Sequence, residues 1–188
     1  VKEVYLEKEE LLRLIDYTER FAKNSKEYLI LKMYQFSCFC GLRFSDVMDL
    51  RWRDVDFENE LIRKKMIKTK SEVITPLFPM ARDILMEKSD GGRLLGSDEK
   101  IFYNYAEPTV NKTLREHTKK AGIDKHLTYH SSRHTFATLL VIDKVDIYTI
   151  SKYLGHKSVN MTQRYLKYDL SIAKESAKNI STFSGKNE

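Results

Sequence analysis

The sequence is poor in cysteine, proline and glycine, and it lacks any long uninterrupted run of apolar residues. Its 188 residues include 2 Cys, 3 Pro and 7 Gly. Two cysteines cannot build the multi-bridge framework of a small secreted domain, and Cys38 and Cys40 lie two apart, so they point to different faces of a helix. The apolar run at residues 139–142 is far too short to span a bilayer. We therefore expect a cytoplasmic protein with no membrane partner.

Two common cofactor signals are also missing. No set of four cysteine and histidine residues has the spacing of a zinc site, and the glycine-rich stretch at residues 89–97 lacks the GxxxxGK[ST] pattern of a phosphate-binding loop. What is present is a chain with 41% apolar and 11% aromatic residues, enough to fill the core of one domain. The net charge of +6 is compatible with a polyanionic partner but does not require one.

Apolar residues recur at helical spacing over most of the chain, which predicts several helices. We expect helices over residues 4–21, 27–40, 81–88 and 107–121, and a further series between residues 130 and 168. Gly41 and Gly122 follow two of these segments, where glycine commonly ends a helix. Ser45 is expected to cap a short helix that continues through Leu50. Arg43 would then lie in the tight junction between two helices.

An alternating pattern between residues 52 and 77 predicts three short strands. The fold class is therefore α+β, mainly α-helical with a small three-stranded antiparallel sheet. Lysines crowd the expected turn between the second and third strands, and they are Lys64, Lys65, Lys68 and Lys70. They form either a solvated edge that discourages aggregation or a mobile basic finger that reaches a phosphate.

The helix expected at residues 107–121 is basic. Its cationic residues are Lys112, Arg115, Lys119 and Lys120. A basic stripe of this kind suits contacts to a nucleic-acid backbone, although a plain solvated face explains it equally well.

Residues 130–165 gather the side chains that could hold and attack a phosphodiester. They include His130, Arg133 and His156, followed by Tyr165. Arginine presents a planar fork of donors that fits phosphate oxygens, and histidine can donate a hydrogen bond or accept a proton near neutrality. A tyrosine can act as a covalent nucleophile if a neighbour helps to remove its proton, because an unassisted phenol has a pKa of about 10.

Each of these residues also has a structural interpretation. Tyr165 could be a core aromatic, and His156 could simply satisfy carbonyls at a helix end. Residues 146–165 can be drawn as two short helices joined at a glycine, as in a helix-turn-helix whose second helix enters the major groove of DNA. A non-catalytic DNA-binding regulator is therefore the alternative from a different functional class.

Four sequence boxes, in this order, resemble the catalytic domain of the tyrosine recombinases, also called the phage integrase family. They are GLRFSDV with Arg43, MIKTKSEVITPL with Lys68, HSSRHTFAT with His130 and Arg133, and LGHKSVNMTQRY with His156 nine residues before Tyr165. Two residues depart from the family pattern. Asp46 stands where Glu is more frequent, and Ser132 stands where Leu is usual.

The resemblance implies a metal-free and cofactor-free reaction in which Tyr165 forms a 3′-phosphotyrosyl link to DNA. Arg43 and Arg133 would hold the non-bridging phosphate oxygens. Lys68 would protonate the leaving 5′-oxygen, although Lys65 and Lys70 are close enough to substitute for it. His130 would accept or position the tyrosine proton, and His156 would donate to a phosphate oxygen. Asp46 and His134 would support these groups without touching the substrate.

The resemblance also predicts how the protein is organised. Residues 1–168 would be the catalytic domain, and residues 169–188 would form a helix exchanged between subunits and a frayed tail. Family members carry an additional amino-terminal DNA-binding domain, so we expect this chain to be a fragment that is monomeric by itself. The intact enzyme would act on double-stranded DNA as a tetramer at the nucleoid.

A topoisomerase related to the recombinases, which shares the chemistry, is a further alternative.

Overall fold

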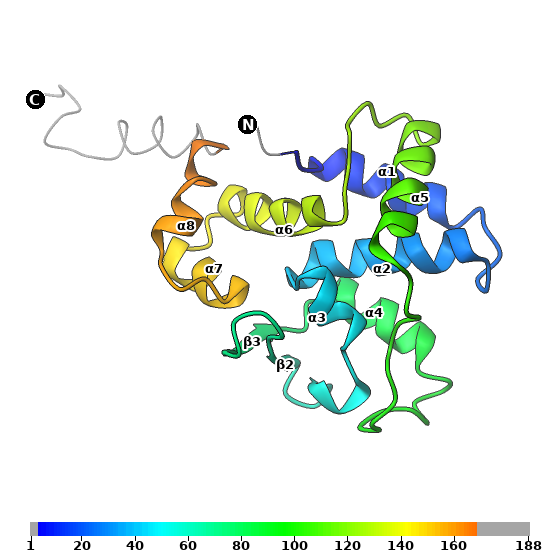
Figure 1. Cartoon of the computed structure of the whole chain (residues 1–188), viewed down its shortest axis with the longest axis horizontal. Coiled ribbons are helices and arrows are strands. Elements are labelled where there is room, and N and C mark those ends of the chain that lie inside the picture. The colour runs from blue at the N-terminus through cyan, green and yellow to red at the C-terminus, as the bar shows by residue number, and fades with distance from the viewer. Residues whose placement is uncertain (1–3, 169–188) are drawn as a thin grey trace, which may run out of the picture.

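A computed structural model of the chain describes residues 4–168. Helix α2 lies at the centre, and four other helices pack around it (Figure 1). The central helix is α2 (Lys26–Cys40), and the surrounding ones are α1 (Lys8–Thr18), α4 (Pro79–Lys88), α5 (Glu107–Lys120) and α6 (His130–Ile142). Because α2 is covered on nearly every side, its sequence is apolar around most of its circumference.

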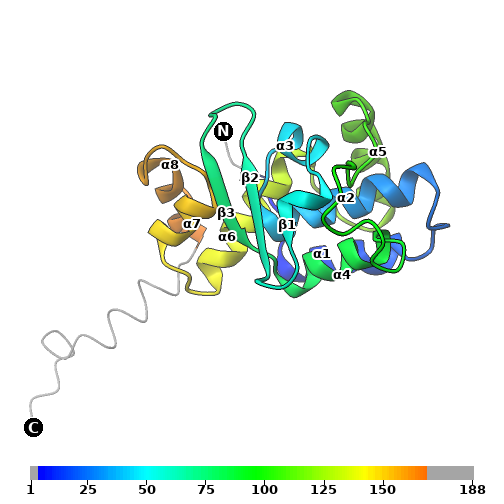
Figure 2. The ribbon, with the colours of Figure 1, turned by 90° about the horizontal axis from the view of Figure 1, so that it is seen from below.

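The predicted three-stranded antiparallel sheet is confirmed. Its strands are β1 (Val55–Asp56), β2 (Leu61–Lys65) and β3 (Glu72–Pro76), in the order β1-β2-β3. Helix α3 (Phe44–Met48) and the short 3₁₀ helix η1 (Trp52–Asp54) connect α2 to the sheet. Figure 2 shows β2 and β3 side by side, with their connecting loop projecting from one end. The register pairs Lys65 with Glu72, so residues 66–71 form that loop.

The lysine cluster of the sheet is divided by the two-residue period of the strand. Lys64 faces inward, where its Nζ donates to Asp49 Oδ2 at 2.8 Å and to Asp54 Oδ2 at 3.1 Å. The hydrogen bond from Lys64 is the main reason that the pKa of Asp49 lies below its ordinary value. Lys65, Lys68 and Lys70 are exposed. Lys64 therefore has a structural role, and only the other three are available to a ligand.

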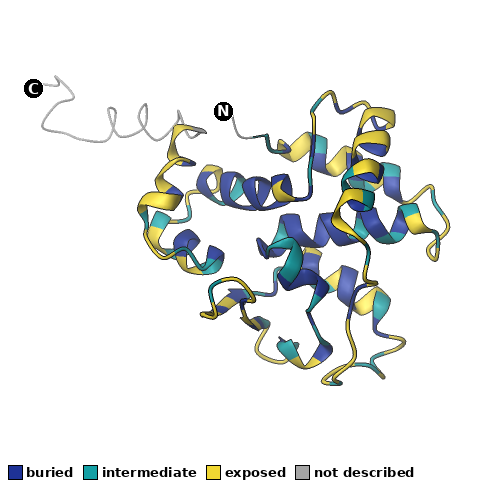
Figure 3. Ribbon diagram, in the orientation of Figure 1, coloured by how far each residue is buried: buried dark blue, intermediate teal, exposed yellow. Residues whose placement is uncertain are grey.

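The interior is divided into a large and a small apolar cluster. The large one surrounds α2 and includes Trp52 and Tyr34. The small one lies between α6 and helix α7 (Ile147–Leu154), and its buried members are Phe136, Ala137, Val141, Ile150, Leu154 and Tyr165. Figure 3 shows the buried residues of α6 running along most of its length. Because α7 also packs on β3, the small cluster lies beside the sheet.

Helix α7 fits the first of the two short helices drawn within residues 146–165, whereas α1 is shorter than the helix predicted at residues 4–21 and α3 begins before its predicted cap. Asp146 caps α7, accepting from Thr149 N at 2.9 Å. The helix after Gly41 is not capped by Ser45. It begins at Phe44, because the carbonyl of Arg43 accepts from the backbone amides three and four residues further on, both at 3.0 Å.

The last short helix does not carry Tyr165. Helix α8 (Asn160–Gln163) ends two residues before Tyr165, which lies in the turn leading to the 3₁₀ helix η2 (Leu166–Tyr168). Packing of its ring in the small cluster fixes the tyrosine there, and this tertiary contact outweighs the local helical pattern. The subunit-exchanging helix and tail predicted at residues 169–188 lie outside the described residues. In the part of the chain that is described, none of the helices combines the length and the apolar character needed to cross a lipid bilayer.

Gly41 ends α2 at a place where a side chain has no room. Its φ is 68°, in the left-handed region, and a Cβ atom added there would lie 2.4 Å from Phe136 Cδ1. We expect Gly41→Ala to lower the free energy of unfolding by about 2–4 kcal/mol, the sum of backbone strain and overpacking. Thermal unfolding should show a melting temperature lower by at least about 4 °C.

Gly91→Ala is the matched control, because Gly91 has a φ of 66° and nothing within 4 Å of its added Cβ. It should lose only about 1 kcal/mol, the cost of the left-handed backbone alone. Equal losses for the two variants would show that the contact between Gly41 and Phe136 contributes nothing.

Candidate active site

Arg133 joins three helices at one point. It lies in the first turn of α6, is 3% exposed, and donates from Nη1 to Gly41 O at 2.6 Å and from Nη2 to Leu154 O. These two carbonyls are at the carboxyl ends of α2 and α7, where the helix dipoles concentrate negative potential. A buried guanidinium is therefore held by neutral carbonyls, and its charge is not cancelled by a carboxylate.

Arg43 follows two residues after Gly41 and leads into α3. Its Nη1 is buried and has no hydrogen-bond partner among residues 4–168. A buried donor left unsatisfied costs about 1–3 kcal/mol. An oxygen of a bound anion would remove that cost. Among the described residues, Arg43 therefore has a free donor for a ligand, whereas Nη1 and Nη2 of Arg133 already donate to carbonyls.

The positive charges of these arginines act on two histidines. Burial lowers the pKa of His130, and the charges of Arg133, Arg164 and Arg43 lower it further. Burial, then the charges of Arg133, Arg43 and Arg164, lower the pKa of His156 to about 4. The same three arginines therefore influence both imidazoles, which remain neutral at pH 7. Residues that are distant in the sequence converge on one electropositive site.

Tyr165 lies beside this site, fully buried. Its Oη is 2.9 Å from Nδ1 of His134 and 3.4 Å from Nη2 of Arg164. The Arg164 guanidinium also lies over the tyrosine ring, 5.2 Å from its centroid. The His130 ring meets His134 edge-on, with centroids 4.7 Å apart. His134, expected only to support other residues, thus contacts the phenol directly, while His130 lies against His134.

His156 is held by a residue that the sequence did not single out. Its Nδ1 is 2.7 Å from Thr162 Oγ1, and Thr162 is fully buried in α8. If the threonine hydroxyl donates to Nδ1, the single proton of the neutral imidazole is on Nε2, where it can be donated to a ligand. Arg164 was also not predicted, although its position directly before Tyr165 is the signal that could have indicated it.

Asp46 holds the loop that carries Lys68. Its Oδ1 accepts from Ile67 N at 2.7 Å, so α3 is fastened to the loop between β2 and β3. Oδ2 is buried without a hydrogen-bond partner in the described chain. Lys68 follows directly, is exposed, and its charge contributes to the low pKa of His130. Asp46 therefore positions the loop that carries Lys68.

Arg43, Arg133 and Arg164 together form what we call the arginine cluster. The remaining predicted residues lie outside it. Lys112, Arg115 and Lys119 are exposed on α5, which Figure 1 shows on the other side of α2 from α7 and α8. Ser132, which stands where leucine is usual, is buried and donates to Tyr129 O at 2.7 Å. A local hydrogen bond therefore replaces the apolar packing of a leucine at this position. Within residues 4–168 there is no group of three or more histidine, cysteine or acidic residues arranged to hold a metal ion.

Comparison with known proteins identifies the family. Residues 4–170 match the phage integrase family, and the chain belongs to it. A tyrosine recombinase of Pseudothermotoga lettingae is 33% identical over 163 residues, which are 84% of this chain and 54% of that protein. The chain spans about half the length of the curated relatives it matches.

Solved structures show the same fold. A crystal structure of XerA recombinase superimposes with a TM-score of 0.73 at 28% identity, covering 95% of this chain and 65% of the other. XerH site-specific recombinase, crystallised with its palindromic difH substrate in a post-cleavage complex, has a TM-score of 0.71 at 23% identity, covering 94% of this chain and 53% of the other. The tyrosine recombinase catalytic-domain fold expected from the sequence is confirmed.

The depressed pKa of His156 gives the fold a pH dependence. The pKa is about 4 in the folded chain and about 6.5 when unfolded. The unfolded state therefore takes up the proton first, so stability is intact above about pH 6.5 and is lost as the pH falls toward 4. We expect His156→Gln to show a smaller fall in melting temperature than the original chain between pH 7 and pH 4.5.

His126→Gln provides the control, because His126 is exposed in the segment before α6. It should retain the pH dependence of the original chain. If His156→Gln loses stability with pH as steeply as the original chain, burial beside the arginines does not control the protonation of His156.

Proposed function

We propose that this chain is the catalytic part of a site-specific tyrosine recombinase that cleaves and rejoins double-stranded DNA at the nucleoid. The observation that carries the proposal is the convergence of Arg43, Arg133 and Arg164 on two neutral imidazoles beside a phenol hydrogen-bonded to His134. Membership of the phage integrase family supports it, as do relatives named as tyrosine recombinases.

In the proposed reaction, Tyr165 Oη attacks the scissile phosphorus and its proton passes to an imidazole. His134 is the first candidate acceptor because it already bonds the phenol, and His130 lies against its ring. The P–O5′ bond breaks as the new P–O bond forms, and Lys68 gives the leaving 5′-oxygen its proton. The phosphotyrosyl bond keeps the energy of the original ester, so a 5′-hydroxyl can reverse the step without ATP.

Arg43 and Arg133 have different parts in this proposal. Arg43 Nη1 has no partner in the described chain, so a phosphate oxygen would complete its hydrogen bonding. Arg133 already uses two nitrogens on backbone carbonyls, so it contributes fixed charge together with its remaining donors. His156, neutral and fixed by Thr162, would donate to a second oxygen. Preorganised donors of this kind each contribute about 10²-fold or more to rate.

The helix-turn-helix alternative has little structural support. The second helix of such a motif must present its side chains along the major groove, whereas α8 is only 4 residues long. Helix α7 is packed against α6 and β3. This region is better suited to holding His156 and Tyr165 than to reading bases.

A nicked suicide substrate should trap the chain as a covalent protein–DNA adduct. We expect Tyr165→Phe to abolish the adduct while DNA binding persists, because only the nucleophilic oxygen is removed. Tyr153→Phe, which removes a hydroxyl from a partly buried ring of the small cluster, should still form it. Denaturing gels measure the adduct and a mobility shift measures binding.

A DNA-binding regulator would give no adduct with any variant, and relaxation of a supercoiled plasmid lacking a specific site would favour the topoisomerase.

We also propose that the active form is a tetramer joined through the carboxy-terminal segment. A groove of about 530 Å³ lies between α1, α2, α4 and α6, and Leu12, Met80 and Ile142 line it with partly exposed apolar side chains. Residues 170–180 have apolar residues at helical spacing together with Lys174 and Lys178. Because Glu7, Glu9 and Asp143 also line the groove, its charge complements that segment from a neighbouring copy.

Truncation after Tyr168 should leave folding largely intact and weaken assembly on DNA, since it removes the proposed occupant of the groove. Leu12→Glu should have the same effect from the other side of the contact, whereas Met86→Glu, at an exposed position on α4 outside the groove, should not. Native gels of complexes with two duplexes, formed by the natural polypeptide containing this chain, measure assembly. Undiminished assembly by the truncated protein would contradict the proposal.

A further inference from the structure

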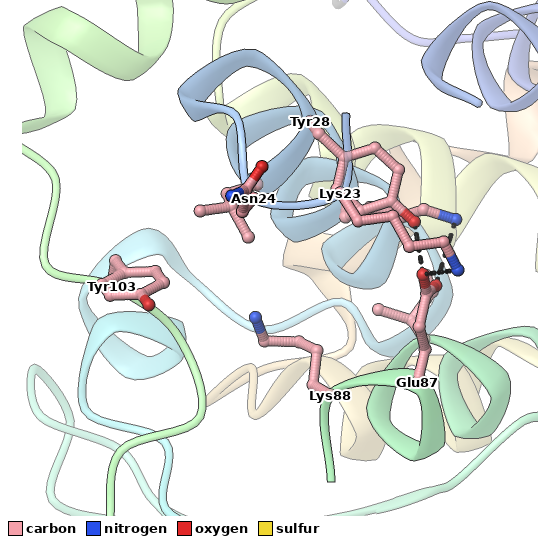
Figure 4. Close-up of a pocket in the computed structure, with 9 residues that line it drawn as sticks. Lys23, Asn24, Tyr28, Glu87, Lys88 and Tyr103 are labelled. Atoms are coloured by element: carbon pink, nitrogen blue, oxygen red, sulfur yellow. Dashed lines mark hydrogen bonds and ion pairs between the residues drawn. The ribbon is translucent and has the colours of Figure 1, made fainter. Parts of the chain in front are cut away.

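A second cavity lies at the end of α2 remote from the arginine cluster. It has a volume of about 240 Å³ and is formed by the α1–α2 connection, the first turns of α2, the last turn of α4 and the segment before α5 (Figure 4). Helix α2 is 15 residues long, so the cavity and Gly41 are roughly 20 Å apart at a rise of about 1.5 Å per residue. The cavity is therefore separate from the proposed catalytic site.

Two of its three lysines already have carboxylate partners. Lys23 Nζ lies 2.6 Å from Glu87 Oε1, and Lys32 Nζ lies 2.5 Å from Glu19 Oε1 and 3.8 Å from Glu87 Oε2. Tyr28 also donates to Glu87 at 2.6 Å. Burial opposes the ionisation of Glu87, but these donors outweigh it and hold the pKa of this carboxyl below its ordinary value. This part of the cavity is close to electrically balanced.

Lys88 is the exception. Its Nζ lies over the rings of Phe102 and Tyr103, 5.5 Å and 5.8 Å from their centroids. Within residues 4–168 it has no hydrogen-bond acceptor or ion pair, and Figure 4 shows it pointing into the cavity. Burial lowers the pKa of Lys88, and the charge of Glu87 only partly compensates. The ammonium has aromatic faces around it but lacks an anionic oxygen.

The shape and charge of the cavity limit what could supply that oxygen. Its volume equals the share of liquid occupied by about eight water molecules, below the about 300–1,000 Å³ typical of drug-sized ligands. Leu29 and Ile84 add apolar walls, and the 63% exposed ring of Tyr103 can cover a flat group. One unpaired positive charge beside the Glu87 carboxylate suits a monoanion better than a phosphate ester, which carries about −1.5 to −2 charges.

We propose that this cavity binds a small monoanionic organic acid, a carboxylate on a single planar ring. The carboxylate accepts from Lys88 Nζ and the ring lies against Tyr103. Nothing in the proposed recombination chemistry uses these residues, so the site is independent of DNA cleavage.

Benzoate is the probe, with acetate and inorganic phosphate compared at equal ionic strength by calorimetry on the whole chain. We expect saturable benzoate binding that Lys88→Met weakens about tenfold or more, because a charge-assisted hydrogen bond is lost. Tyr103→Leu should weaken it about two- to tenfold through the lost ring contact. Lys120→Met, which removes an exposed lysine of α5 outside the cavity, is the control and should bind as the original chain does.

A second measurement guards against a variant that fails to fold. In the original chain, the ¹³Cε resonance of Lys88 should titrate at higher pH when benzoate is bound, because a paired carboxylate favours the ammonium. Benzoate binding that is absent or unchanged in folded Lys88→Met would overturn the proposal, and so would a Lys88 titration unaffected by benzoate. Tighter binding of phosphate, or equal binding of acetate, would overturn the assignment of the ligand as a ring carboxylate.

Discussion

The structure depends on the hydrogen bonds of Arg133 to the carbonyls of Gly41 and Leu154. They bring the start of α6 to the ends of α2 and α7, and these ends hold the residues of the candidate active site. Both carbonyls are accessible because a glycine in the left-handed conformation turns the chain away at each helix end. At both glycines the neighbouring element is so close that a Cβ atom would collide with it. One buried cation thus aligns three helices.

The choice of carbonyl partners has an electrostatic consequence. A carboxylate paired with Arg133 would cancel its charge, whereas carbonyls satisfy its hydrogen bonds and leave the charge in place. Asp46, the buried acid nearby, gives one oxygen to the backbone of the hairpin loop. The field of Arg133, Arg43 and Arg164 therefore remains, and it lowers the pKa of both histidines. The same field favours a bound anion, whose negative charge would take the place of the missing carboxylate.

The sequence predicted the features that depend on short-range interactions, such as helix ends and the alternation of strand residues. Asp146 and Gly155 fix both ends of α7 by capping, in agreement with the two short helices joined at a glycine that were drawn for residues 146–165. The three-stranded sheet follows from its alternating pattern, and that period also explains why Lys64 is buried. The placement of Tyr165 depends on contacts with α6 and α7, which no short window of sequence contains. His134 lies one turn of helix beyond His130, and only the position of Tyr165 decides which imidazole meets the phenol.

In the proposed reaction, the burial of Tyr165 opposes its attack on phosphorus. Its ring belongs to the small apolar cluster, and its hydroxyl bonds His134, so exposing both would cost about 2–4 kcal/mol. In the proposed reaction the phenol, already 3.4 Å from Arg164 Nη2, would have to leave the small cluster, and α8 would shift with it because α8 ends two residues earlier. A phosphodiester that satisfies Arg43 recovers about 1–3 kcal/mol. In the proposed reaction, a bound phosphodiester would thus supply most of the free energy that releases Tyr165, which would couple cleavage to the binding of DNA.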